Sequence, residues 1–159
     1  EIVEKQKLTD ILYYSFDEKI HKGQLIIDKR LKKDIDEIFK LARQIKFPIE
    51  KAVPISAYGW NDDISMKHNN TSGFNYRKIA NTARLSNHAY GFAIDINPQL
   101  NPCIKDGKIL PDGANYNPTK PGTFNIEHSI VKKFKELGWI WGGDWKSLKD
   151  YQHFEKVLK

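Results

Sequence analysis

An apolar stripe at helical spacing runs through the charged stretch of residues 28–46. Its members recur three or four residues apart, with lysines and acids between them: Leu31, Ile35, Ile38, Phe39, Ala42 and Ile45. This pattern predicts an amphipathic helix with one buried face. Asp28 is a suitable capping residue for its start, and Pro48 follows its end. The charged residues 29–36 therefore form the solvated face of this helix and not a binding patch.

A second helix is predicted between Asn125 and Gly138. Asn125 can cap its start and Gly138 favours a C-terminal stop. Its apolar members form one stripe: Ile126, Ile130, Val131, Phe134 and Leu137. We expect residues 1–25 to form a helical segment packed on the domain, or a linker, and the main domain to span residues 26–159.

Short apolar runs bounded by turn residues predict several strands. They cover residues 52–58, 92–96, 139–141 and 151–154, with 74–77 as a further extended segment. Residues 103–110 predict a hairpin that turns on Asp106-Gly107, whereas 61–72 and 111–124 predict loops. Together these elements indicate an α+β fold. We expect helices on one face of a small, mostly antiparallel sheet, with the other face lining the functional site.

Composition agrees with a single folded domain. The chain has 159 residues, of which 40% are hydrophobic, and contains four tryptophans; this is enough for a globular core. No apolar run approaches the length of a membrane span, and no signal-peptide pattern begins at Glu1. We therefore expect a trimmed mature form or a domain fragment that acts as a monomer. The single Cys103 excludes an intramolecular disulfide and is expected to be an inert thiol.

The net charge of +6 favours polyanionic surroundings. Bacterial wall polymers and nucleic acids both qualify on charge alone. A nucleic-acid binder would gather its basic residues on one face beside exposed aromatic side chains. Because the lysines here are dispersed over two predicted helices, we expect no nucleic-acid partner.

Two segments far apart in the chain carry groups that could bind one metal ion. His88 and Asp95 lie in Ser-Asn-His-Ala-Tyr-Gly-Phe-Ala-Ile-Asp, residues 86–95, and His153 ends Asp-Tyr-Gln-His, residues 150–153. Imidazole nitrogen and carboxylate oxygen suit zinc, and a catalytic zinc has three protein ligands plus an open position. Strand alternation turns Asp95 away from the apolar side chains and into a cavity. A carboxylate buried there needs a partner.

Other uses of the histidines are weaker. A nucleophilic triad of Ser86, His88 and Asp95 can be written, but the histidine and aspartate of the second segment would then have no role. The remaining histidines lie outside both segments and are expected to be surface residues or satisfied core residues: His21, His68 and His128.

The order Ser86-x-His88-x-x-Gly91-x-Ala93-x-Asp95, followed by Asp150-x-x-His153, resembles the signature of the zinc peptidoglycan peptidases. This family, the LAS metallopeptidases, comprises D-Ala-D-Ala carboxypeptidases, D-Ala-D-Ala dipeptidases and L-Ala-D-Glu endopeptidases, and it shares its fold with the Hedgehog signalling domain. The likeness covers residues 52–155 and includes Phe-Asn-Tyr-Arg at 74–77 and Gly-Trp-Ile-Trp-Gly-Gly-Asp-Trp at 138–145. Dipeptidases and many carboxypeptidases carry glutamate where this chain has Asp150. The sequence is therefore more similar to the endopeptidase branch.

The resemblance implies a role for each residue of the motifs. One zinc ion per chain is held by three ligands: His88, Asp95 and His153. Asp150 takes the proton of the attacking water and passes it to the leaving amine. Arg77 holds the oxyanion, and Arg84 is the second choice for that role.

Further side chains near the motifs are candidates for the substrate cleft. Tyr90, Trp141 and Trp145 form either its walls or part of the core. Asp144 either binds the substrate amine or caps its own turn, and Ser86 supports the histidine turn through a local hydrogen bond.

The implied activity is zinc-dependent hydrolysis of a peptide bond in peptidoglycan stem peptides, in the cell envelope or outside the cell. L-Ala-D-Glu is the favoured bond, and D-Ala-D-Ala carboxypeptidase activity is the alternative. A non-catalytic, Hedgehog-like zinc-binding domain is an alternative of another class, and it would make no use of Asp150.

Overall fold

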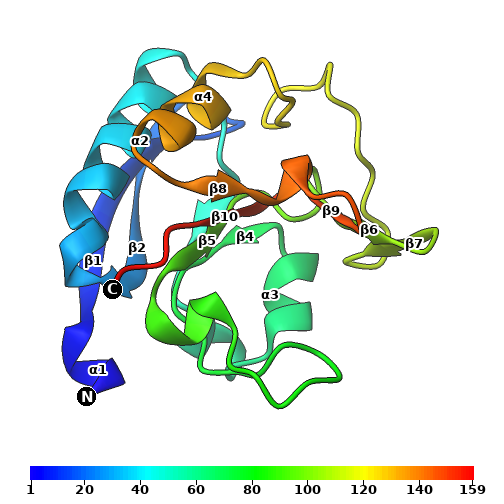
Figure 1. The fold of residues 1–159 in the computed structure, drawn as a ribbon. Coiled ribbons are helices and arrows are strands. Elements are labelled where there is room, and N and C mark those ends of the chain that lie inside the picture. Colours follow the sequence, from blue (N-terminus) through cyan, green and yellow to red (C-terminus); the bar gives the residue numbers. More distant parts are fainter.

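The computed structural model describes all residues, 1–159 (Figure 1). Its helices are α1 Ile2–Lys5, α2 Lys32–Gln44, α3 Asp62–Lys67 and α4 Ser129–Glu136. Its strands are β1 Gln6–Tyr14, β2 Ile20–Asp28, β3 Lys51–Ala52, β4 Asn70–Thr71, β5 Ala93–Asp95, β6 Cys103–Lys105, β7 Lys108–Leu110, β8 Ile140–Trp141, β9 Lys149–Asp150 and β10 His153–Glu155. Short 3-10 turns η1 Lys29–Leu31, η2 Ile55–Tyr58, η3 Asn87–Tyr90 and η4 Gly142–Asp144 connect them.

The central sheet has the order β5-β10-β8 and is antiparallel throughout. Its register places His153 opposite Asp95, and Phe154 opposite Ile94. Because side chains alternate between the two faces of a strand, Ile94 and Phe154 enter the core while Asp95 and His153 share the other face. The predicted α+β class with small antiparallel sheets is confirmed, although the strands are divided among four small sheets.

The two long helices cover the apolar face of this sheet. Figure 1 shows α2 and α4 together on one side of β5, β10 and β8, with α3 on the other side. The Phe134 ring of α4 stacks on Phe154 of β10, with their centroids 3.9 Å apart. The predicted stripe of α2 is buried up to Ala42, whereas Ile45 lies beyond the helix end and is 42% exposed.

The second helix begins later than predicted. Residue 125 lies in a turn, where its side chain accepts the Glu127 N–H, and α4 starts at Ser129. His128 caps it instead, because its Nδ1 accepts the backbone N–H of Ile130 at 3.2 Å. Ile126, which was expected in the buried stripe, is therefore left outside the helix and is exposed.

The prediction of a helical segment or linker over residues 1–25 is wrong. Only α1 is helical there, and β1 and β2 form a hairpin in full antiparallel register. Alternate positions of the hairpin point inward, so that its apolar side chains join the main core: Ile11, Tyr13, Leu25 and Ile27. The expected boundary at residue 25 falls inside β2, whose inward positions share one core with α2.

Residues 52–72 also differ from expectation. The predicted strand ends at Ala52, because Pro54 has no N–H for a ladder and instead precedes η2. The predicted loop contains α3, whose start is capped by the Asn61 side chain accepting the Ile64 N–H at 3.0 Å. Two acids in its first turn favour the helix N-terminus.

The hairpin predicted over residues 103–110 is confirmed. Asp106 and Gly107 both have positive φ, 49° and 74°, as a tight two-residue hairpin turn requires. On its other edge β6 pairs with β9, which places Asp150 opposite Cys103. No helix of the structure combines the length and apolar character that a membrane crossing would need.

Candidate metal centre

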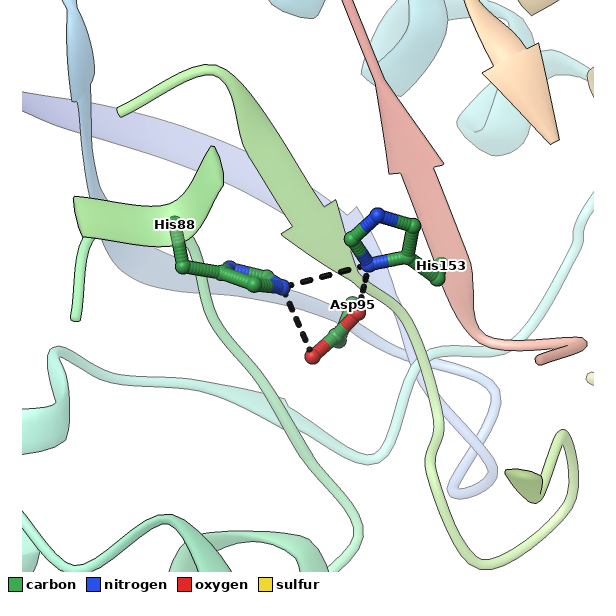
Figure 2. A group of neighbouring side chains, drawn as sticks. All are labelled: His88, Asp95 and His153. Carbon is green, nitrogen blue, oxygen red and sulfur yellow. Dashed lines mark hydrogen bonds and ion pairs between the residues drawn. The ribbon is translucent and has the colours of Figure 1, made fainter. Parts of the chain in front are cut away.

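Three buried side chains meet on the polar face of the central sheet. Figure 2 shows His88 from η3, Asp95 from β5 and His153 from β10 turned toward one point. The candidate ligand atoms all lie within 4.8 Å of one another. His88 Nε2 is 3.1 Å from Asp95 Oδ2, His153 Nδ1 is 3.1 Å from Asp95 Oδ1, and the two nitrogens are 3.2 Å apart. The sequence prediction that these residues come together is met by this geometry.

Local backbone structure fixes the direction of His88. Ser86 caps η3, and its Oγ accepts the His88 N–H at 3.3 Å. Gly91 ends η3 with a φ of 71°, in the left-handed region that glycine favours. The imidazole Nδ1 of His88 lies 2.7 Å from the carbonyl oxygen of Gly73. Since a carbonyl oxygen only accepts, Nδ1 carries the proton and Nε2 is left as a lone-pair donor.

Glu155 fixes His153 in the same way. Its Oε2 lies 2.7 Å from His153 Nε2 and also accepts a hydrogen bond from Asn87 Nδ2 at 2.9 Å. Nε2 therefore carries the proton, and Nδ1 faces the cluster. The sequence analysis missed Glu155, although a carboxylate two positions after a histidine on a strand must share its face.

This donor set fits a divalent cation. His88 Nε2 and His153 Nδ1 face each other, and each ring carries its proton on the other nitrogen. Two lone pairs and the Asp95 carboxylate therefore meet at one point, and a cation or an additional proton is needed to offset their repulsion. Without a cation, burial opposes charging His153, but hydrogen bonds to Asp95 and Glu155 outweigh it and raise its pKa to about 10. Burial likewise opposes ionising Asp95, but the two histidines hold its pKa far below its usual range. Nitrogen and oxygen ligands with carboxylate and carbonyl support are typical of zinc sites.

Asp150 stands beside the cluster with an unused oxygen. Its Oδ1 is buried and has no hydrogen-bond partner. Burial is the main reason that the pKa of Asp150 rises to about 6, partly offset by the positive charge of His153. Gly142 lets the backbone of η4 pass against Asp150, because a Cβ there would lie 2.4 Å from the Asp150 carbonyl oxygen.

Cys103 lies beside this carboxylate on the neighbouring strand. It faces Asp150 in the β6–β9 pairing and is half-buried. Burial, followed by the charge of Asp150, raises the pKa of its thiol to about 12. A protonated thiol of this kind agrees with the expected inert role.

Arg77 approaches the cluster, and Arg84 does not. Arg77 is half-buried, and its Nη2 pairs with Asp62 Oδ2 of α3 at 3.2 Å. Its charge lowers the pKa of Asp150 among other contributions, whereas the Arg84 side chain is exposed. Asp62 was not singled out from the sequence, because its segment was expected to be a loop.

The remaining candidates differ in burial and contacts. Trp145 is half-buried, with its ring centroid 5.2 Å from that of His153. Trp141 is 2% exposed and stacks on Phe154, and Tyr90 packs against the core beside Phe92, so these two show the contacts of core residues. Asp144 pairs with Lys135 of α4 at 2.7 Å.

The other histidines lie away from the cluster. His21 pairs with Asp17 at 2.8 Å, His68 is exposed, and His128 caps α4. His21 and His68 lie at the surface, whereas His128 packs edge-on against Phe47 and Phe124 and is half-buried, and the prediction of surface or satisfied core residues fits all three.

Comparisons with known proteins point in one direction. Residues 80–156 match the sequence profile of a family described as D-alanyl-D-alanine carboxypeptidase. Over 72 residues the chain is 42% identical to the peptidoglycan L-alanyl-D-glutamate endopeptidase CwlK of Bacillus subtilis (strain 168). That stretch is 45% of this chain and 40% of the relative, so the chain spans less than half the length of the relative it matches. No solved structure matches the chain. The matched region contains all three clustered side chains and Asp150, so the likeness to the family described as D-alanyl-D-alanine carboxypeptidase includes the whole candidate metal centre.

Proposed function

We propose that this protein is a zinc-dependent peptidase that hydrolyses a peptide bond in peptidoglycan stem peptides. The observation that carries the proposal is Asp150, whose buried Oδ1 has no partner and lies beside a buried His-Asp-His cluster. A carboxylate kept free and with its pKa raised to about 6 is suited to accept and return a proton near neutral pH. A purely structural metal site has no need of such a group.

The zinc ligands in this proposal are His88, Asp95 and His153. When bound, zinc supplies Lewis-acid polarisation of the scissile carbonyl and lowers the pKa of water. Gly73 and Glu155 keep the two imidazoles in the tautomers that such binding requires.

The other residues move a proton and hold the substrate. Asp150 takes a proton from the attacking water at Oδ1 and transfers it to the leaving amine. Arg77 donates to the carbonyl oxygen as negative charge develops there, and its ion pair with Asp62 keeps the guanidinium in place. Trp145 lines the cleft beside His153.

L-Ala-D-Glu is the bond that we propose is cut. The relative CwlK is described as an L-alanyl-D-glutamate endopeptidase, and the acid before the last histidine is Asp150, as in the endopeptidase branch. The second candidate is D-Ala-D-Ala carboxypeptidase activity, because the matching family carries that description. Either substrate places the protein in the cell envelope or outside the cell, and we propose that it acts there as a monomer.

Mass spectrometry of muropeptides after digestion of purified sacculi tests this proposal. Cutting at L-Ala-D-Glu releases peptides that begin with D-Glu, whereas carboxypeptidase action releases only D-Ala. Absence of both products with zinc-loaded protein would overturn the enzymatic proposal and favour a non-catalytic zinc-binding domain.

A further inference from the structure

The extended segment 73–79 runs antiparallel to residues 84–88, and this fixes which side chains face the cluster. The backbone N–H of Asn75 donates to the His88 carbonyl oxygen at 3.1 Å, and that of Ser86 donates to the Arg77 carbonyl oxygen at 3.0 Å. A bridge between Lys78 and Leu85 continues the same register. Directly opposite residues of an antiparallel pair place their side chains on the same side. The backbone of residue 75 is therefore paired with His88 and that of residue 77 with Ser86, and the side chains of Asn75 and Arg77, two positions apart, share one side of the segment.

Asn75 is buried on a segment whose backbone bonds to His88, and its side chain has an unused donor. The residue is 3% exposed, and its Nδ2 has no hydrogen-bond partner. The Nε of Arg77, two positions further along the same side, is also buried and unpartnered. Leaving a buried donor unpaired is costly, so a ligand that supplies the missing acceptor is favoured at this place.

Other buried asparagines of the molecule are fully engaged. The Nδ2 of Asn70 donates to the Val53 carbonyl oxygen and to Ser65 Oγ. The Nδ2 of Asn101 donates to the carbonyl oxygens of Ile96 and Gly122. These side chains hold loops together, whereas the Asn75 amide nitrogen holds nothing.

The chemistry of the unpaired atoms indicates what they bind. An amide NH₂ and a guanidinium N–H are donors only, so their ligand is an oxygen acceptor. The Asn75 backbone is hydrogen-bonded to His88, a candidate metal ligand, which brings this part of the segment close to the metal centre. We infer that Asn75 Nδ2 and Arg77 together donate to the oxygen of the scissile peptide carbonyl, so that Asn75 is a second oxyanion donor. This inference rests on the proposed peptidase function.

Kinetics of Asn75→Ala on a soluble muropeptide test the inference. Loss of one oxyanion donor typically lowers kcat about 10²–10³-fold, and we expect a loss of this size with KM changed little. Zinc content should remain that of the wild type. The melting temperature should not fall, because the side-chain donor removed was unpaired. Asn75→Asp keeps the size of the side chain and removes both N–H groups of the amide, so its kcat should fall by a similar factor. This variant provides the test if Asn75→Ala does not fold.

Asn70→Ser is the matched control, because it alters a buried asparagine that is already paired. It should lower the melting temperature and leave kcat per zinc-loaded molecule unchanged. If the zinc-replete Asn75 variants keep the kcat of the unmodified protein, or if only KM rises, the inference is overturned. The proposed function still stands in that case, because the unmodified protein turns over the substrate. Loss of zinc in both Asn75 variants would also overturn it, since Asn75 would then support the metal ligands. Absence of wild-type turnover would instead refute the proposed function.

Discussion

At the scale of single residues, His88 and His153 present different ring nitrogens to the cluster, Nε2 from the first and Nδ1 from the second. The choice follows from their partners, because the Gly73 carbonyl oxygen accepts a hydrogen bond from His88 Nδ1–H and Glu155 accepts one from His153 Nε2–H. The ligand types follow from sequence alone. Their tautomers do not, because Gly73 is 15 residues from His88 and acts through its backbone.

Glu155 gives the first prediction at this scale. Glu155→Ala removes the acceptor that orients His153, and changes of this kind typically weaken metal affinity about 10–100-fold. Glu155→Gln keeps an oxygen that can accept from Nε2 and should have the smaller effect. Zinc affinity measured by competition with a chelating dye distinguishes the two variants. Glu127→Ala is the control, because Glu127 is exposed and forms an ion pair with Lys132 instead of contacting a histidine of the cluster. Equal affinity in Glu155→Ala and wild type would show that His153 is held by other contacts.

At the scale of elements, the pattern of apolar positions predicted α2, the 103–110 hairpin and the strand at Asp95, because each has a strong local signal. It failed for β1 and β2, where inward and outward positions are both partly apolar: Leu8, Leu12 and Ile20 are exposed while Ile11 and Leu25 are buried. Such a mixed pattern has no clear period of two. It also failed at α3, whose six residues are short and polar, so that the Asn61 cap is its main sequence signal.

The contact between η4 and β9 gives a prediction about the position of Asp150. In Gly142→Ala the new Cβ would lie 2.4 Å from the Asp150 carbonyl oxygen and 2.9 Å from the Asp150 Cβ, so either η4 or β9 must shift. A shift of about 1 Å in a catalytic group can cost on the order of 10²-fold in rate. We expect turnover to fall by at least about tenfold while zinc content, measured by elemental analysis, is retained. Wild-type turnover in this variant would mean that Asp150 tolerates displacement or is not used.

The junction between β2 and η1 gives a prediction of pH dependence. Asp28 is fully buried and accepts hydrogen bonds from the Arg30 backbone N–H and guanidinium at 2.8–2.9 Å. These bonds hold the pKa of Asp28 below its ordinary value. Its stabilising contribution is therefore present above the unfolded pKa of about 3.9 and is lost as pH falls through the folded pKa.

Urea unfolding of Asp28→Asn in metal-free buffer checks this dependence. At pH 7 the variant should be less stable by about 1.5–3 kcal/mol, the usual value of a hydrogen bond to a charged group. The difference should shrink as the pH is lowered below about 4. A difference that is constant across this range would show that the charge of Asp28 contributes nothing.

At the scale of the whole molecule, residues 1–28 are part of the folded unit. The side chains that β1 and β2 send inward share one core with α2, α4 and the central sheet. This arrangement could not be predicted from local patterns, because it depends on pairings between distant segments. The motif residues could be predicted, because their residue types and their order in the sequence indicate metal binding without knowledge of how the segments pair.

Truncation tests the role of the hairpin. Removing residues 1–28 exposes core surface that Ile11, Tyr13, Leu25 and Ile27 cover, at about 1.5–3 kcal/mol for each buried side chain. The sum is comparable with the whole stability of a typical domain, about 5–15 kcal/mol. We expect the truncated chain to lose cooperative thermal unfolding by circular dichroism, whereas removal of the exposed residue 1 should change little. A folded, zinc-binding fragment 29–159 would contradict this account of the core.

The central claim is that Asp150 serves as a proton acceptor beside a zinc ion held by His88, Asp95 and His153. Asp150→Asn preserves the size of the side chain, but its amide cannot accept the proton of water at neutral pH. Zinc occupancy and peptide release from sacculi, measured on one preparation of this variant, test the claim most directly. We expect wild-type zinc occupancy with turnover reduced roughly 10²–10⁴-fold. Full turnover, or a loss of zinc in proportion to the loss of activity, would contradict it.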